Sequence, residues 1–501
     1  MAGVTLSHIL EMAKRGLSAQ RLGIDITGHN IANAATPGYS RQRVDFRTGE
    51  VLKTNQGLLG TGVISSNGGR MRNAFVDEQV RNSYSSLQES TVQREALTRV
   101  ESKVNELAIS GLGNQLTKFF NSFQTLAQQP EELGPRTAVI NQAKRLIDSF
   151  HTSYQTYLSL QKEAVDKVQT VLERINELGK KIADLDMEVL RLQSVNANPS
   201  DAKDQRDMLI DELSKLANVK VSEDSKGSVI VSIGGTVVAS RAGSIELQIE
   251  YSSVDSVFEN ADVTIPKLVI ATQPYNDDSA EDVNLRLVNV FSGELNGLMK
   301  VYNETLTPSI MRLNTMANKL IERVNELHEE GAGRYNPELE DSPSGNSFFI
   351  SIDDLPAADD VVLGASAQLI RLSDEILADP NAVAASSDSA IAGDNAIALQ
   401  IASLANASTL LLNADDEPTV TFNEYHQKNI DSIASAIFNA STNEQASQVI
   451  LQQMQIQQQE VSGVSTDEEM TNLINFQRAY DASAKVASTV NDMYLTLLNM
   501  V

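Results

Sequence analysis

The side chains best able to bind a metal ion are histidines and paired aspartates. The histidines are His8, His29, His151, His328 and His426. A zinc site needs imidazoles at a short fixed spacing, such as four residues apart on a helix, and no two of these histidines have it. The aspartate pairs 353–354 and 359–360 lack the alternating oxygens and the closing Glu of a calcium loop. We therefore predict no metal ligands, and we expect the histidines to be ordinary surface or interface residues.

Other catalytic patterns are equally weak. The chain has no cysteine, so it has no thiol nucleophile and no disulfide. It contains no GxSxG elbow and no GxxxxGK[ST] phosphate loop, and the glycines of GLLGTG at 57–62 fit turns better than a dinucleotide fingerprint. Two carboxylates could in principle perform acid–base chemistry, but nothing singles out a pair. We predict no catalytic residue, no cofactor and no enzyme activity.

Length and charge narrow the class of protein. The 501 residues suggest about three domains. The net charge of -26 argues against nucleic acid or an anionic membrane as a partner. No apolar run approaches the roughly 20 residues of a spanning helix. The N-terminal segment lacks the apolar core of a cleaved signal peptide, so any export is expected to use another route.

Both ends of the chain carry an apolar stripe with alternating spacings of three and four, which is typical of heptad helices. The N-terminal stripe comprises Leu6, Leu10, Ala13, Leu17, Gln20, Ile24, Thr27, Ile31 and Ala34. The C-terminal stripe comprises Met470, Leu473, Gln477, Tyr480, Ala484, Ala487, Asn491, Tyr494, Leu498 and Val501. Three acidic residues at 467–469 mark a helix start. Gly16 and Gly23 weaken the first helix.

These terminal stripes allow two interpretations. The helices could pack in an ordinary bundle, or they could become ordered when copies of the chain associate. Their location at the ends, their small and polar stripe positions and their opposite net charges favour the second interpretation.

The segment from 29 to 43, HNIANAATPGYSRQR, joins the first helix to a basic strand. Pro37 ends the helix, and Pro37-Gly38 predicts a turn. Asn and Ser residues suited to caps surround it, and Tyr39 offers an aromatic face with a polar tip. We predict a rigid corner here. A second polar segment, 204–207, is expected to begin a helix with local ion pairs worth only tenths of a kcal/mol.

The fold class predicted is mainly α with β insertions, a multidomain α+β protein with nested, discontinuous domains. Long helices are expected from about 75, over 161–195, 200–216, 298–331, 396–412 and 421–459, with Pro308 kinking or restarting its helix. Hairpins are expected after 217, with turns at 226–227 and 234–235. The predicted domains are a terminal coiled-coil assembly domain (1–66 and 462–501), a helical body (67–219, 288–345 and 388–461), an outward β domain (220–287) and a solvated, acidic, loop-rich insertion (346–387).

Asn30-Ile31-Ala32-Asn33-Ala34-Ala35-Thr36-Pro37-Gly38-Tyr39-Ser40-Arg41-Gln42 resembles the N-terminal signature of flagellar rod, hook and hook-associated proteins, and its Tyr-Ser-Arg-Gln ending resembles the hook-associated branch. The run from Glu469 to Lys485, with Phe476-Gln477-Arg478-Ala479-Tyr480, is similar to the other end of these families. Asp204-Gln205-Arg206-Asp207, Phe348-Phe349 and Gly393-Asp394-Asn395 extend the resemblance through the helical body.

The resemblance implies a structural, extracellular subunit of the hook–filament junction, exported unfolded by the flagellar type III apparatus. Its expected partners are hook protein, a second junction hook-associated protein beside the filament, an export chaperone at the C-terminal region, and copies of itself in a ring of about eleven. The N-terminal assembly interface is predicted at Leu6, Leu10, Leu17, Ile24, Ile31, Asn33, Pro37, Gly38, Tyr39 and Arg41. The C-terminal one is predicted at Leu473, Gln477, Tyr480, Ala484, Ala487, Tyr494 and Leu498.

Two alternatives remain open from the sequence. The chain could be another axial protein, such as a hook, distal rod or flagellin-like filament subunit. It could also be a secreted hydrolase with an active site in 220–420, although no nucleophile–base pair or metal ligand set supports that. Loss of the hook in a deletion strain would favour the first alternative, and activity of an isolated 220–420 fragment the second.

Overall fold

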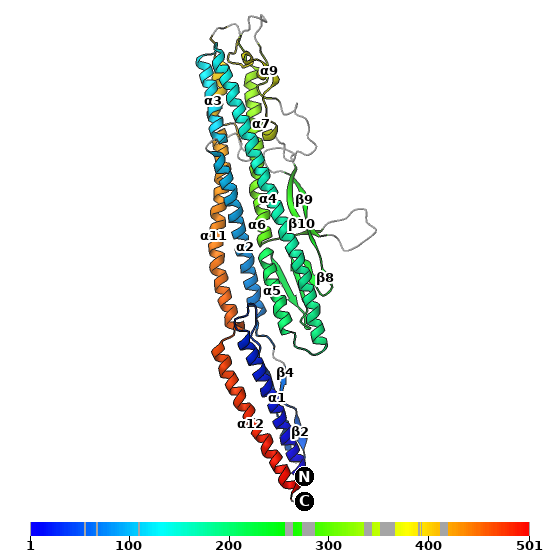
Figure 1. The fold of residues 1–501 in the computed structure, drawn as a ribbon. Helices are drawn as coiled ribbons and strands as arrows, with labels where there is room; N and C mark the ends of the chain where they lie inside the picture. The colour runs from blue at the N-terminus through cyan, green and yellow to red at the C-terminus, as the bar shows by residue number, and fades with distance from the viewer. Residues whose placement is uncertain are drawn as a thin grey trace, which may run out of the picture. The chain divides into compact units, whose positions relative to one another are not determined.

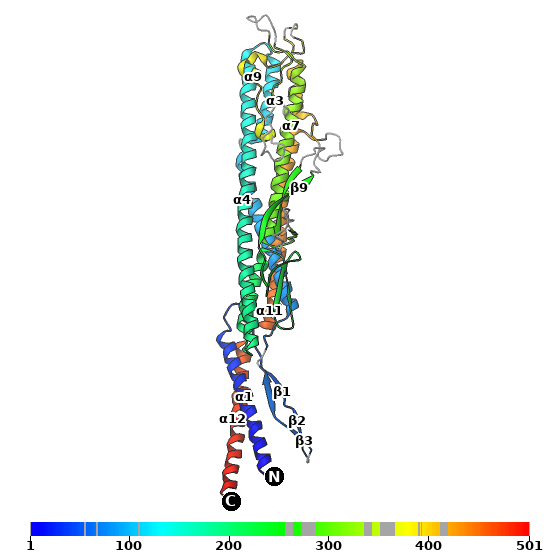
Figure 2. The same cartoon turned by 90° about the vertical axis from the view of Figure 1, so that its right-hand side faces the viewer.

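The computed structural model describes residues 2–54, 57–66, 69–108, 111–255, 264–272, 286–334, 343–350, 366–388, 391, 393–410 and 419–499. It is mainly helical with small antiparallel sheets (Figures 1 and 2), which confirms the predicted fold class. Contacts within the chain define two compact units. Unit 1 comprises Met1–Leu87, Ile175–Glu246 and Ala446–Val501, and unit 2 comprises Gln88–Arg174 and Leu247–Gln445.

Three long helices contribute to both units: α2 (Ala74–Ala108), α4 (Leu133–Ser194) and α11 (Phe422–Ser462). The sequence analysis expected the second of these to begin only near residue 161, and this was wrong. The preceding segment buries Val139, Leu146 and Phe150 on one face with helical spacing. Its Pro135 lies in the first turn, where a missing N–H costs no helical hydrogen bond. The helix therefore runs unbroken for 62 residues.

Unit 1 contains the two ends of the chain. Helices α1 (Ala2–Ala32) and α12 (Thr466–Leu498) lie side by side in both ribbon views (Figures 1 and 2). Between α1 and α2, the chain forms two short antiparallel pairs. Strand β1 (Asp45–Thr48) pairs with β4 (Val63–Ser66), and β2 (Val51–Thr54) pairs with β3 (Gly57–Gly60).

A four-stranded sheet in unit 1 follows α5 (Ser200–Leu216). Its strands are β5 (Val219–Glu223), β6 (Val229–Ile233), β7 (Thr236–Ser240) and β8 (Gly243–Ser244), joined in sequence order. The turns fall at the glycines that the sequence indicated, and Gly227 and Gly235 have φ angles of 72° and 82°. These left-handed conformations are easily adopted by glycine, so the predicted hairpin turns are confirmed.

Unit 2 contains the remaining helices and a second sheet. Its helices are α3 (Leu112–Gln128), α6 (Glu294–Lys300), α7 (Thr307–Glu329), α8 (Ser366–Leu369), α9 (Asp374–Ala378) and α10 (Ala396–Ser403), with 3-10 turns at Pro380–Ala382 and Leu404–Asn406. The sheet has the order β11 (Arg286–Val288), β10 (Thr264–Thr272), β9 (Leu247–Asp255). The aromatic core of unit 2 is formed by the packed rings of Phe119, Phe123, Phe348 and Phe349.

The change of helix type expected near Pro308 takes the form of a π-helical segment just before it, while the backbone angles stay helical. A π-helical turn, Val301–Leu306, separates α6 from α7, and Pro308 sits in the first turn of α7. The turn presents Asn303, whose amide oxygen accepts from the Leu268 N–H at 2.9 Å and whose amide nitrogen donates to the Leu268 carbonyl at 3.0 Å. The side chain thus satisfies backbone groups of β10 where no β11 residue is paired with it.

The expectation of a solvated surface over 346–387 is wrong for the described part of that range. Phe348, Ile370, Ile376 and Val383 are fully buried there. The acidic residues are interleaved with apolar ones, and α8 packs against α7. Composition averages over both kinds of residue, so it concealed the few apolar side chains that join the core.

His328 corrects a further expectation, because it is a core residue and not a surface one. Its Nδ1 lies 2.6 Å from the Asn346 carbonyl, and its Nε2 accepts from the Ala384 N–H at 2.8 Å. This pattern requires neutral imidazole with the proton on Nδ1. Burial lowers the pKa of His328 to about 4, and nearby Arg136 acts in the same direction.

His328 should therefore make unit 2 sensitive to mild acid. Between the unfolded pKa of about 6.5 and the folded value, the unfolded chain takes up a proton that the folded chain does not, so stability falls as pH falls. His328→Gln keeps a donor and an acceptor but cannot titrate. We expect a lower Tm at pH 7 but a shallower decline between pH 6.5 and 4, measured by circular dichroism melts. Equal declines in both proteins would contradict this assignment.

Candidate assembly site at the paired terminal helices

Helices α1 and α12 meet through small residues that recur every seven positions. A Cβ built on Gly16 would lie 3.1 Å from the Ser483 hydroxyl, and one on Gly23 would lie 3.0 Å from the Phe476 ring. The next step along both helices joins Asn30 to Glu469 by a 2.9 Å hydrogen bond. Residue numbers at these contacts increase along α1 and decrease along α12, so the two helices are antiparallel. The glycines that weaken α1 as an isolated helix thus allow its partner to approach closely.

We call Gly16, Gly23 and Asn30, with the positions seven residues before them, the contact line of α1. Four large residues of the predicted apolar stripe lie beside this contact line. Leu10, Leu17, Ile24 and Ile31 also recur every seven residues, but each is one position beyond a residue of the contact line, about 100° around the helix. Leu17, Ile24 and Ile31 remain half-buried, and Leu10 is exposed, by 39%. Leu6 is also half-buried. The large side chains of α1 are therefore left beside the intramolecular contact.

Of the interface residues predicted on α12, some are half-buried and others are exposed. Leu473, Ala484, Ala487 and Tyr494 are half-buried, whereas Gln477, Tyr480 and Leu498 are exposed, Leu498 by 71%. The sequence analysis missed Phe476, Ser483 and Val490, which line the contact with α1 or are buried. These three residues follow Glu469 at intervals of seven, and this spacing could have identified them from the sequence.

The corner after α1 is organised by the amide of Asn30. Its nitrogen donates to the Gln42 carbonyl at 2.8 Å, and its oxygen accepts from the Gln42 N–H at 3.0 Å and from the Tyr39 hydroxyl at 2.7 Å. Burial, followed by Asp201, Asp204 and Glu469, raises the pKa of Tyr39, so its hydroxyl stays protonated and can donate. The expectation of a rigid corner is thus met by one buried amide that closes the loop onto the helix.

Glycine is required at the turn of this corner. Gly38 has a φ of 77°, and a Cβ there would lie 2.3 Å from the Met208 side chain. The residues Asn33 and Pro37 lie in the turn itself, where the Asn33 carbonyl accepts from the Thr36 N–H at 2.9 Å. The turn predicted at Pro37-Gly38 is therefore present, with a backbone hydrogen bond before it and a left-handed glycine at its end.

Glu469 joins the corner to the start of α12. Its carboxylate accepts from Asn30 Nδ2 at 2.9 Å, from Arg41 Nε at 2.8 Å and lies 2.7 Å from Arg41 Nη2. Its side chain is 3% exposed, whereas that of Glu468, which also binds Arg41, is 63% exposed. Glu469 in the first turn of α12 thus connects both terminal helices through buried, charge-assisted hydrogen bonds.

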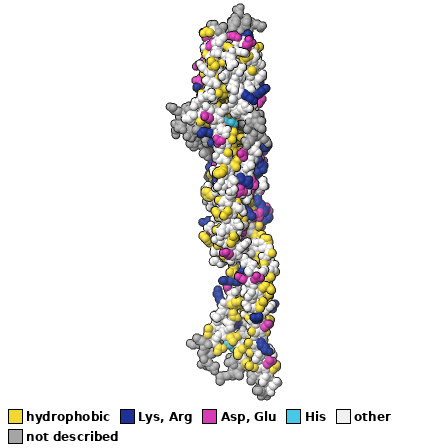
Figure 3. Space-filling model, turned by 90° about the vertical axis from the view of Figure 1, so that its left-hand side faces the viewer, with side chains coloured by type: hydrophobic (Ala, Val, Ile, Leu, Met, Phe, Trp, Pro, Cys, Tyr) yellow, Lys and Arg dark blue, Asp and Glu magenta, His cyan; other side chains and the backbone are white. Residues whose placement is uncertain are grey.

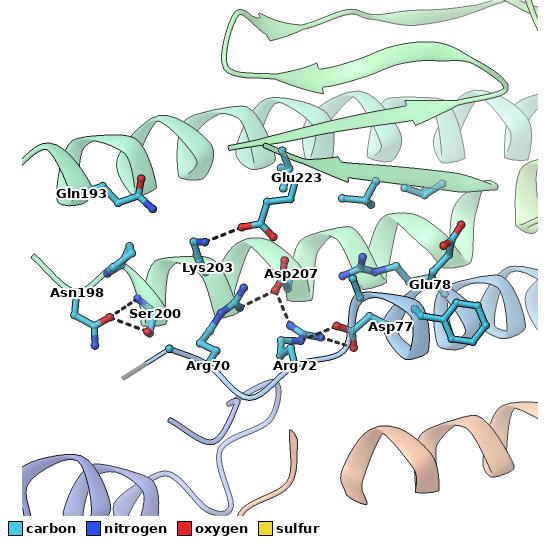
Figure 4. A pocket seen from close by; sticks show the side chains of 18 of the residues that line it. Arg70, Arg72, Asp77, Glu78, Gln193, Asn198, Ser200, Lys203, Asp207 and Glu223 are labelled. Carbon is cyan, nitrogen blue, oxygen red and sulfur yellow. Dashed lines mark hydrogen bonds and ion pairs between the residues drawn. The ribbon is translucent and has the colours of Figure 1, made fainter. Parts of the chain in front are cut away.

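The corner is also tied to α5 by ion pairs. Asp204 accepts from the Ser40 hydroxyl at 2.7 Å and from Arg70 at 2.8 Å. Asp207 binds Arg70 at 2.7 Å and Arg72 at 2.6 Å, and Arg72 continues to Asp77 at 3.0 Å. Figure 4 shows the side chains of Arg70, Arg72, Asp77 and Asp207 directed toward one another at the edge of a cleft of about 910 Å³.

Besides one local ion pair, Arg206 with Asp207 at 3.9 Å, the segment 204–207 forms ion pairs with more distant parts of the chain. Arg206 and Asp186 are both fully buried and lie 2.6 Å apart, and Asp186 also accepts from Ser228 and the Val229 N–H. Burial acts to raise the pKa of Asp207, but four arginines, with Arg72 the strongest, hold it below its usual value. The sequence could not show Arg70 and Arg72 as partners of Asp207, because they lie more than 130 residues away along the chain.

Nothing in this arrangement resembles a reaction centre. The acidic side chains of the corner are each neutralised by arginine or capped by hydrogen bonds. Across the described residues, no group of three or more His, Asp or Glu side chains is placed to hold a metal ion. Within that same part of the chain, no helix is long and apolar enough to cross a membrane. The site is built to join chain segments.

Three family models match this chain. The model described as "Flagellar hook-associated protein FlgK helical domain" matches residues 97–349. "Flagella basal body rod protein" matches residues 10–39, and "Flagellar basal body rod FlgEFG protein C-terminal" matches residues 456–500. The latter two fall on α1 with its corner and on α12, so the paired termini are the part shared with flagellar axial proteins.

Relatives match over nearly the whole chain. "Flagellar hook-associated protein 1" of Bacillus subtilis (strain 168) is 27% identical, over 98% of this chain and 97% of the relative. The protein of that name from Escherichia coli (strain K12) is 24% identical, over 99% of this chain and 100% of the relative. The solved flagellar hook junction protein FlgK from Burkholderia pseudomallei shares the fold, with a TM-score of 0.59 at 14% identity over 77% of this chain and 100% of that one.

These findings define first a class, the axial structural proteins of the bacterial flagellum. Within that class, the chain belongs to the family of flagellar hook-associated proteins, FlgK, whose helical-domain model spans half of it.

Proposed function

We propose that this protein is the structural adaptor that joins hook to filament at the hook–filament junction. The observation that supports this most is the terminal helix pair, which is closed at one end by Glu469 and the corner and leaves Leu10 of α1 exposed and Leu17, Ile24 and Ile31 half-buried. In support, the relatives are named flagellar hook-associated protein 1, and the similar solved structure is named a flagellar hook junction protein. The adaptor would be extracellular, exported by the flagellar type III apparatus without a cleaved signal.

The physical basis of polymerisation is the stripe of Leu10, Leu17, Ile24 and Ile31. Each such side chain contributes roughly 1.5–3 kcal/mol when fully buried. Because Leu10 is exposed and Leu17, Ile24 and Ile31 are only half-buried beside the α1–α12 pair, part of that free energy stays available for neighbouring copies. We propose that these residues, with Leu473, Tyr480 and Leu498, form the assembly interface of a ring of about eleven subunits.

The remaining partners follow from the same position in the axis. Hook protein would contact the ring on one side, and a second junction hook-associated protein would contact it on the filament side. An export chaperone would hold the C-terminal region before secretion. The domain division proposed for this architecture is the terminal pair 1–66 and 462–501, the helical body, the β domain 220–287 and the insertion 346–387.

A deletion strain tests the proposal. Without this protein, electron microscopy should show hooks that lack filaments, with filament protein shed into the medium. The full chain should restore filaments, whereas a chain truncated after 469 should be expressed without restoring them. Loss of the hook itself, or normal filaments with the truncated chain, would overturn the proposal. Immunoblots of cells and medium control for expression and export.

A further inference from the structure

Residues 379–386, which we name the strap, follow α9 in unit 2 and lie against the backbone at the end of α7. The apolar residues at 382–385 in the strap are all buried. A Cβ built on Gly331, just after α7, would lie 2.8 Å from the Ala384 side chain. The strap therefore packs closely on the chain where α7 ends.

One peptide group of the strap is held from both sides. The N–H of Ala384 donates to Nε2 of His328, on α7, at 2.8 Å. The carbonyl of Val383 belongs to the same peptide group, and it accepts from Nη1 of Arg136, near the start of α4. The same nitrogen of Arg136 also donates to the Asn381 carbonyl at 3.4 Å. Side chains from two different helices thus hold the strap at a single peptide plane.

The contact at His328 requires an unprotonated ring nitrogen. Nδ1 donates to the Asn346 carbonyl at 2.6 Å, so Nε2 is the acceptor for Ala384. When Nε2 gains a proton it becomes a donor that faces another donor, and this hydrogen bond is lost. The new positive charge also lies one peptide group away from the guanidinium of Arg136, which repels it. Protonation of His328 therefore opposes the closed position of the strap twice.

The other charged groups on the surrounding elements do not offset this effect. Burial and Arg136 both lower the pKa of His328. The segment 343–350 and α10 carry no charged residue. The charged residues on the remaining elements interact with Arg136 or are exposed: Glu131, Asp379 and Arg334 do the first, and Glu329 and Glu330 the second. Arg136 is thus the charge that a protonated His328 meets.

We propose that His328 and Arg136 form an acid-sensitive latch, which releases the strap from α7 when the imidazole is protonated. Apart from one 3-10 turn, the strap is irregular, and its far end is held by backbone bonds such as that from the Ala332 N–H to the Ser386 carbonyl, at 2.8 Å. Such a segment opens locally while the helices around it stay folded. Release brings Val383 into solvent, so mild acid exposes apolar surface before unit 2 unfolds. The latch acts within one chain and does not depend on the proposed function.

Hydrogen exchange of the full chain, read by mass spectrometry on peptides that cover the strap, tests the latch. The opened strap binds one proton that the closed strap does not. Its opening constant should therefore rise about 20-fold from pH 7 to pH 5, after correction for the intrinsic exchange rate. Peptides from the middle of α7, around Leu320, should keep their protection over the same range. Equal losses in both regions would mean that unit 2 unfolds as a whole, and would overturn the proposal.

Two variants assign the effect to His328. Exposed carboxylates, many of which are seen in Figure 3, also titrate toward acid pH, so a baseline is needed. His328→Gln supplies it, because glutamine keeps a donor and an acceptor but gains no proton, and we expect less than a threefold rise. His151→Gln is the matched control. Nε2 of His151 meets the Ile370 carbonyl at 3.1 Å, a contact that a protonated ring also makes, so the 20-fold rise should remain.

A measurement on the wild-type chain covers the case in which His328→Gln does not fold. With 15N-labelled histidine, the nuclear magnetic resonance spectrum should show His328 as the neutral ring with its proton on Nδ1 at pH 5.5, as long as the strap is closed. A protonated His328 beside a strap that still resists exchange would contradict the latch. So would equal pH dependence of strap exchange in the wild-type chain and His328→Gln.

Discussion

Gly23→Leu should separate the terminal helices and abolish filament attachment. At Gly23 even a methyl group would lie 3.0 Å from the Phe476 ring, and a leucine adds three more carbons at the same place. Overpacking of this kind costs roughly 1–3 kcal/mol or more in a core. A pair held by small residues cannot absorb that without the helices moving apart. The fraction of hooks bearing filaments in the deletion strain measures the effect.

Gly28→Leu is the matched control, because a Cβ at Gly28 meets nothing within 4 Å in the same helix. Spin labels on cysteines at Ser18 and Asp481, both exposed, report the distance between α1 and α12 in each variant. We expect Gly28→Leu to keep the wild-type distance distribution and Gly23→Leu to broaden it. Identical distributions for both variants would show that the contact at Phe476 does not hold the pair.

Glu469→Ala should have the second largest effect. The substitution leaves the Asn30 amide and the Arg41 guanidinium without their common acceptor at the corner. Removing one partner of a buried ion pair costs roughly 3–5 kcal/mol, because the other charge stays desolvated. The loss should appear in the urea-induced unfolding of the terminal helices and as hooks without filaments.

Glu468→Ala provides the comparison at the neighbouring position. Glu468 also binds Arg41, at 2.9 Å, but its side chain is 63% exposed. Exposed ion pairs contribute about 0–1 kcal/mol, so we expect near wild-type stability and filament attachment. Equal losses for both variants would mean that the total negative charge of this helix start matters, and not the buried hydrogen bonds of Glu469.

The existence and type of the terminal elements could be predicted because their signals are local. The heptad spacing, the acid cluster at 467–469 and the Pro37-Gly38 turn each lie within one or two helical turns of the chain. The stripe predicted on α1 is buried only in part: Ala13 and Thr27 are buried, whereas Leu17 and Ile24 are half-buried. The closest contacts with α12 are made one residue earlier, at Gly16 and Gly23.

The polar corner was predicted only in outline for the same physical reason. Asn30 and Tyr39 were expected at a turn, and the hydrogen bond between them lies within that segment. Asp204, Arg70 and Glu469 come from three distant places in the chain, and single-sequence patterns carry no information on such pairings. The buried side chains of 366–388 and His328 were missed likewise, because burial depends on neighbours that the fold supplies.

The sequence by itself thus determined that the two ends are heptad helices, that a glycine turn follows the first, and that the chain is an acidic, cysteine-free protein with a flagellar signature. Only the tertiary structure decided which side of each helix faces the other, through close contacts at Gly16 and Gly23. It also decided that Glu469 is buried and that the large apolar side chains of α1 remain beside the pair. Periodicity restricts a helix to a broad apolar sector, and only packing against a partner selects the line within it.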